Sequence, residues 1–137
     1  MRIRGWLTRR VRLKRKATLE DVYARIPGVS CKGLCQDSCG PIAMSREEER
    51  RVREAGADIP PMTEALAALE RGEEYYCPAL RDGSCSIHEI RPTICRLWGA
   101  TQSMPCPHGC TPPGALTQAE SFELLRLAAR AGGGMTD

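Results

Sequence analysis

The sequence predicts a small, mostly α-helical and irregular domain. Two observations indicate this class: several stretches combine a helix-capping signal with apolar residues at helical spacing, and no stretch alternates apolar and polar residues over the length of a strand. A third observation concerns the core, because the 137 residues include only six aromatic residues (two Trp, three Tyr and one Phe) but eight cysteines. Apolar packing alone is weak in such a domain, and the cysteines are an available source of further stability.

We expect four to five short helices joined by long loops. Three of them begin with a capping box, in which a Ser or Thr N-cap is followed three positions later by an acidic residue, at Thr18–Asp21, Ser45–Glu48 and Thr117–Glu120. A proline precedes or opens the other two, and a glycine follows each of the five. The expected ranges are 18–26, 45–55, 62–71, a short segment within 91–99, and 118–131.

The charge distribution divides the chain into an arm and a body. Residues 1–16 carry eight basic groups and no acidic ones, so the remainder has 12 basic and 17 acidic residues, a net charge of 12 − 17 = −5. We expect three parts: a basic N-terminal arm at 1–16, a single cysteine-cluster metal-binding domain at 17–131, and a flexible tail at 132–137, where three glycines end the last helix.

The basic arm is the one feature that points to nucleic acid. Such arms bind phosphates without sequence preference, and the candidate contacts are Arg9, Arg10, Arg12, Lys14, Arg15 and Lys16. A solvated tail, or a contact with a membrane surface or a protein partner, is the alternative interpretation of the same charges.

No membrane or export segment is predicted. The longest apolar runs fall far short of the roughly 20 residues that a bilayer span needs, and basic residues occupy the place of a signal peptide's apolar region. We therefore expect a cytoplasmic protein without a transmembrane segment. In a reducing compartment, many cysteines in a small protein favour metal or redox chemistry over structural disulfides.

The cysteines form two groups, on either side of two predicted helices. They are Cys31, Cys35 and Cys39, followed by Cys77, Cys85, Cys95, Cys106 and Cys110. Structural thiols, disulfides, and one catalytic cysteine paired with His88 or His108 are the alternatives to metal ligation. Metal is favoured because grouped thiols in glycine-turned loops can converge on one point, where backbone amides stabilise thiolates. All eight are candidate ligands, and His108 in "CPHGC" is a ninth.

Cys95 has the most distinctive local setting. It lies in the first turn of the helix that Pro92 opens, where the helix dipole favours negative charge, and Arg91 and Arg96 flank it. These two arginines are candidates for compensating the charge of a thiolate-bound metal, although exposed arginines would give the same pattern.

The spacing gives a weak preference for the metal. The chain has three C-x3-C spacings and no C-x2-C, the spacing that structural zinc sites often use. This favours an iron–sulfur cluster, for example 4Fe–4S, with zinc as the alternative and one or two sites. No paired carboxylates, phosphate loop or nucleophile–base pair predicts an enzyme, and an accessory role in an oxidoreductase or methylase is the remaining enzymatic hypothesis.

Two strings resemble a known family. "CKGLCQDSCGPI" followed by "MSREEERRV", and then "CPALRDGSCSIHEIRPTICRLWG", are similar to the YkgJ-type cysteine-cluster proteins over about residues 27–110. The matching positions in the second string are Cys77, Cys85, Ser86, Ile87, Arg91, Pro92, Cys95 and Arg96. The resemblance implies a zinc- or iron-chelating domain, related to the cysteine region of flagellin lysine N-methylases. We therefore expect a small metal-binding protein with a structural, redox or sensing role.

Overall fold

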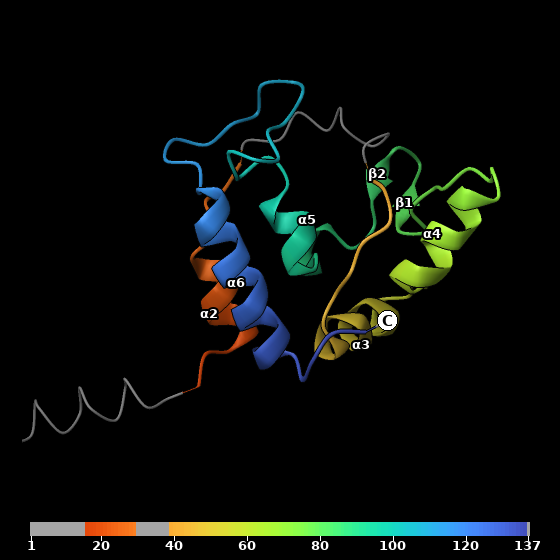
Figure 1. Cartoon of the computed structure of the whole chain (residues 1–137), viewed down its shortest axis with the longest axis horizontal. Helices are drawn as coiled ribbons and strands as arrows, with labels where there is room; N and C mark the ends of the chain where they lie inside the picture. Colours follow the sequence, from red (N-terminus) through yellow and green to blue (C-terminus); the bar gives the residue numbers. More distant parts are fainter. Residues whose placement is uncertain (1–15, 30–38, 137) are drawn as a thin grey trace, which may run out of the picture.

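The computed structural model describes residues 16–29 and 39–136, and helices dominate this part of the chain (Figure 1). Most of the basic arm, together with Cys31 and Cys35, lies outside the described residues. In chain order the described elements are α2 (Leu19–Ala24), α3 (Arg46–Glu54), α4 (Met62–Glu70), β1 (Leu80–Arg81), β2 (Ser84–Cys85), the 3-10 helix η2 (His88–Ile90), α5 (Thr93–Leu97) and α6 (Gln118–Ala131). The predicted class, mostly α and irregular with short helices and long loops, is confirmed.

The predicted capping boxes all form, and they fix where three helices begin. Thr18, Ser45 and Thr117 are the N-caps of α2, α3 and α6, and each is bonded reciprocally with the acidic residue three positions later. α4 and α5 instead begin after prolines, at Pro61 and Pro92. These local signals therefore place all five helices close to their predicted ranges.

A short antiparallel hairpin is the element that the sequence patterns did not indicate. Leu80 of β1 pairs with Cys85 of β2, and Arg81 pairs with Ser84. The two residues between the strands, Asp82 and Gly83, have φ angles of 50° and 78°. Two positive φ angles in a two-residue turn are what an Asp-Gly pair readily supplies, so this dipeptide was the available signal.

Two separate apolar clusters hold the domain together. The first lies where α2, α5 and α6 meet, and its buried members are Leu19, Val22, Leu97, Leu116, Leu124 and Ala128. The second lies between α3 and the hairpin region, and its buried members are Met44, Val52, Ala57, Ile59, Ala79 and Ile87. Cys77 and Cys85 pack against the second cluster, so the hairpin thiols lie at the edge of a core.

The C-terminal residues return to the start of α3. The backbone N–H groups of Arg46 and Glu47 donate to the carbonyl oxygens of Gly134 and Gly132, both at 2.9 Å, and Thr136 donates to the carbonyl of Met44. These carbonyls accept from amides in the first turn of α3, which have no partner within the helix. The extent of the flexible tail stays a prediction, but residues 132–136 make contacts that three glycines do not indicate.

Gly132 is needed for this close approach. A Cβ added there would lie 2.0 Å from the Ser45 hydroxyl oxygen and 2.3 Å from its Cβ, although Gly132 itself has an ordinary φ of −92°. Its small size, and not an unusual backbone angle, lets the end of α6 meet the N-cap of α3.

Candidate metal centre

Six of the eight predicted cysteine ligands lie in the described residues. They are Cys39, Cys77, Cys85, Cys95, Cys106 and Cys110. Cys110 is buried and the other five are partly buried. None is fully exposed, which is the usual situation for thiols that ligate a metal or pack in a core.

Four of these thiols share one neighbourhood. The pKa of the Cys95 thiol is raised to about 12, first by burial and then by the charges that Cys77, Cys85 and Cys39 carry as thiolates. The four thiols are thus electrostatically coupled, although they come from three separate segments. The fold thus joins one cysteine of the first sequence group to three of the second.

The hairpin region and α5 carry three thiols of the second group. Cys85 ends β2 and pairs with Leu80, which begins the hairpin three residues after Cys77. Burial and the charge of Cys85 raise the pKa of Cys77, whereas hydrogen bonds from the backbone of Ala79 and Leu80 lower it. Backbone donors to a sulfur are typical of loops that hold a thiolate ligand.

Arg91 and Arg96 differ in what they contact. The charge of Arg91 lowers the pKa of Cys95, whereas burial and the neighbouring cysteines raise it. The Arg91 Nε donates to the carbonyl of His88 at 2.9 Å. Arg96 points elsewhere: its guanidinium lies 3.8 Å from the centroid of the Tyr23 ring and donates to the carbonyls of Arg91 and Glu89. Arg91, unlike Arg96, is thus the flanking arginine that lowers the pKa of Cys95.

A buried carboxylate fixes the helix that carries Cys95. Glu48 is 3% exposed, and its Oε2 accepts hydrogen bonds from the Thr93 backbone N–H at 2.5 Å and from the Thr93 hydroxyl at 2.8 Å. The same oxygen accepts from the Tyr23 hydroxyl at 2.7 Å, while Oε1 accepts from Ser45. The Glu48 side chain thus connects α2, α3 and α5 by hydrogen bonds. The sequence predicted only its role in capping α3.

Tyr75 is a site residue that the sequence did not predict. Its hydroxyl oxygen is buried and has no hydrogen-bond partner among the residues that the structure describes. Burial raises the pKa of Tyr75 to about 12, and the charges of Cys77, Cys95 and Cys39 contribute to the same shift. The phenol is therefore coupled to three of the four thiols, and the stretch "EEYY" gives no sequence signal of this.

Cys106, Cys110 and His108 lie on a different loop. This loop follows α5 and lies on the α6 side of it, whereas the hairpin lies on the opposite side (Figure 1). A Cβ on Gly99 would lie 3.5 Å from the Cβ of Cys106, and the His108 backbone N–H donates to the Cys106 sulfur at 3.4 Å. The eight predicted ligands thus do not all meet at one point in the described part of the chain.

The thiols do not form a finished ligand set by themselves. Within residues 16–29 and 39–136, no three His, Cys, Asp or Glu side chains are placed to hold a metal ion. The donor types nevertheless suit zinc or iron, because electrostatically coupled thiols, backbone donors to Cys77 and a buried hydroxyl without a partner occur in the same part of the domain. Cys31 and Cys35, from the same sequence group as Cys39, lie outside the described residues.

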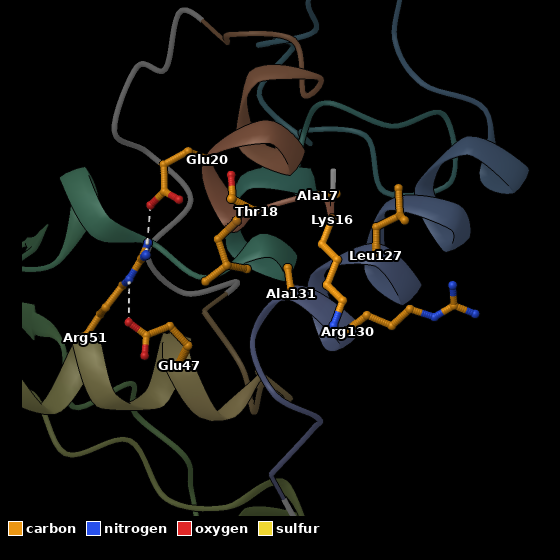
Figure 2. A pocket seen from close by; sticks show the side chains of 10 residues that line it. Lys16, Ala17, Thr18, Glu20, Glu47, Arg51, Leu127, Arg130 and Ala131 are labelled. Carbon is orange, nitrogen blue, oxygen red and sulfur yellow. Dashed lines mark hydrogen bonds and ion pairs between the residues drawn. The ribbon is translucent and has the colours of Figure 1, made fainter. Parts of the chain in front are cut away.

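A charged pocket of about 720 Å³ lies away from the thiols, between the start of α2, α3 and the end of α6 (Figure 2). Figure 2 shows Arg51 reaching between Glu20 and Glu47, with which it forms ion pairs of 2.8 and 3.3 Å. Lys16, the one predicted nucleic-acid contact in the described residues, lines the opposite side with Arg130. The lining of this pocket carries both acidic and basic side chains, which distinguishes it from the cysteine centre.

The fold and the thiol neighbourhood define a small, cysteine-rich helical domain. A family model described as "Putative zinc- or iron-chelating domain", with the short name CxxCxxCC, matches residues 30–120, and the chain belongs to this family. This match confirms the family resemblance and covers all eight cysteines. The first group is spaced C-x3-C-x3-C here and departs from the pattern in that short name. Comparisons with curated proteins and with solved structures find no match.

The described helices contain no membrane-spanning segment, because none of them is both long and apolar enough to cross a bilayer.

Proposed function

We propose that this protein binds one metal centre through Cys39, Cys77, Cys85 and Cys95, with Cys31 and Cys35 as further candidate ligands. The observation that carries the proposal is that thiols from three separate segments are electrostatically coupled, two of them, Cys77 and Cys85, at the edge of the second apolar cluster. Random structural thiols would lie scattered on apolar faces. Membership of a zinc- or iron-chelating family supports the same conclusion independently of the geometry.

The preferred occupant is an iron–sulfur cluster, and zinc is the alternative. The absence of any C-x2-C spacing supports the cluster, since structural zinc sites often use that knuckle. When bound, either group would cross-link the three segments, and a cluster would add one-electron redox chemistry. The loop of residues 98–117, which carries Cys106 and Cys110 and lies on the α6 side of α5 (Figure 1), supports leaving these two cysteines outside this centre.

The proposed role is that of a structural staple. The thiols belong to the part of the domain with the least regular structure, where the strands have two residues each and α5 has five. Structural zinc in small domains contributes about 10–16 kcal/mol of apparent binding free energy, and that free energy drives folding. A metal bound here would hold the hairpin, α5 and the segment after Cys39 in one arrangement.

The matched pair Cys95→Ser and Cys110→Ser tests this assignment. Both variants replace one thiol of the domain, but only Cys95 belongs to the proposed centre. We expect Cys95→Ser to lose the bound metal and Cys110→Ser to keep it at the wild-type stoichiometry, as measured by elemental analysis of protein purified without oxygen. Equal loss in both variants would contradict the division between the two loops.

A second proposal concerns the basic arm, which could bind nucleic acid through its phosphates. Eight basic groups and no acidic ones in residues 1–16, beside a body with a net charge of −5, support it. A salt titration of DNA and RNA binding, with and without residues 1–16, tests it; equal affinity of the two proteins would end the idea. We also propose a cytoplasmic location, where thiols stay reduced.

A further inference from the structure

The Tyr75 hydroxyl has an unusual position for a polar group. Its oxygen is buried, although the side chain as a whole is only partly buried, and no described residue accepts or donates a hydrogen bond to it. Buried hydroxyls without a partner are rare in folded proteins, so each one needs a physical explanation. A phenylalanine would fill the same apolar space without this cost, so the oxygen itself calls for a physical role.

The groups around this hydroxyl are thiols. Tyr75 precedes Cys77 by two positions, and charges on Cys77, Cys95 and Cys39 all act on its phenol. A neutral thiol is a weak hydrogen-bond acceptor, whereas a metal-bound cysteine is a thiolate and accepts well. A cysteine near Tyr75 would therefore become a better acceptor for its hydroxyl on binding a metal.

The next residue gives an internal comparison. Tyr76 is 74% exposed, and its hydroxyl bonds to the Glu74 carboxylate. The two adjacent tyrosines thus differ in the setting of the hydroxyl. The Tyr76 hydroxyl is exposed and has a hydrogen-bond partner, whereas the Tyr75 hydroxyl is buried near the cysteines.

We propose that Tyr75 is a positioning residue of the metal centre, which donates a hydrogen bond from its hydroxyl to a cysteine thiolate in the metal-loaded protein. This inference rests on the proposed function, because the acceptor exists only when a thiolate ligates a metal. Outer groups that bond to a ligand atom fix its orientation and disperse its charge, and their removal typically costs 10–100-fold in metal affinity.

The experiment compares Tyr75→Phe with Tyr76→Phe in the full chain, using Co²⁺ as the probe. Co²⁺ is titrated into metal-free protein without oxygen, and the thiolate-to-cobalt charge-transfer band and a chelator competition are followed. We expect Tyr75→Phe to bind Co²⁺ about 10–100-fold more weakly and to shift the band to longer wavelength, because a thiolate without its hydrogen bond gives up electron density more easily. Tyr76→Phe should match the wild type in both respects.

The possible outcomes separate this inference from the proposed function. Wild-type protein that takes up neither Co²⁺ nor reconstituted iron and sulfide overturns both. Wild-type protein that binds Co²⁺ while Tyr75→Phe shows the same affinity and the same band overturns the hydrogen bond alone. Weaker binding with an unshifted band overturns it as well, because that result indicates loss of packing only. Iron-loaded protein with a phenolate-to-iron band that Tyr75→Phe removes would make Tyr75 a ligand instead of a donor.

Discussion

Replacement of Glu48 tests how the domain holds the helix that carries Cys95. The Glu48 carboxylate accepts hydrogen bonds from Tyr23, Ser45 and Thr93 and is almost completely buried. In Glu48→Ala, the Thr93 hydroxyl and backbone N–H lose their acceptor at the start of α5, and the capping box of α3 is removed.

The magnitude follows from these contacts. A buried donor left without a partner costs about 1–3 kcal/mol, and loss of a helix cap costs about 1 kcal/mol. Release of the buried carboxylate recovers part of its own desolvation cost, so the sum overstates the effect. We expect Glu48→Ala to lower the free energy of unfolding by about 3–5 kcal/mol, a large share of the roughly 5–15 kcal/mol that a domain has.

The assay is urea unfolding followed by circular dichroism, with two matched variants. Glu48→Gln keeps one acceptor oxygen but turns its NH2 group toward the backbone N–H of either Ser45 or Thr93, so it should lose about 1–3 kcal/mol, less than Glu48→Ala. Glu49→Ala removes only a partly exposed ion pair with Arg53 on the same helix and should lose at most about 1 kcal/mol. A Glu48→Ala protein as stable as Glu49→Ala would refute the network as a source of stability.

Three further predictions concern other parts of the chain. Gly132→Ala should lower the free energy of unfolding by about 1–3 kcal/mol, because its Cβ would overlap the α3 N-cap side chain, whereas Gly28→Ala, with nothing within 4 Å, should not lower it in the same urea assay. The pKa of Glu47 is lowered to about 2 from an ordinary 4.5, chiefly by its hydrogen bond with Arg50. The stabilisation that the ionised Glu47 gives the folded protein is therefore complete above pH 4.5 and is lost as the pH falls toward 2. The melting temperatures of wild type and Glu47→Gln should converge over that window, and a constant difference between them would contradict this prediction. Chelation should unfold the domain, and unchanged helical circular dichroism and melting after metal removal would rule out a staple.

The helices could be predicted because their signals are local. Ser45 and Glu48, for example, are three positions apart in sequence and bond to each other across the first turn of α3. The Asp82–Gly83 turn carried an equally local signal for the hairpin, so this element could also have been predicted. Each of these features depends on a few neighbouring residues and not on the rest of the fold.

The site was predictable in its residue types but not in its arrangement. The sequence identified cysteine as the ligand type, yet spacing alone does not show that the loop of residues 98–117 and the hairpin lie on different sides of α5. The second role of Glu48, as acceptor for Thr93, joins positions 45 residues apart. Tyr75 became a candidate only when the fold placed its hydroxyl beside thiols from three segments. Such features depend on tertiary packing, which no local pattern encodes.

The proposal that Cys39, Cys77, Cys85 and Cys95 hold a metal centre is tested most directly by metal analysis of the full chain purified without oxygen. Iron and acid-labile sulfide in stoichiometric amounts, with a brown colour and a broad visible absorption, is the result we predict; a colourless protein with stoichiometric zinc would keep the centre and change its occupant. A folded protein with neither metal, whose thiols all react freely, would contradict the account.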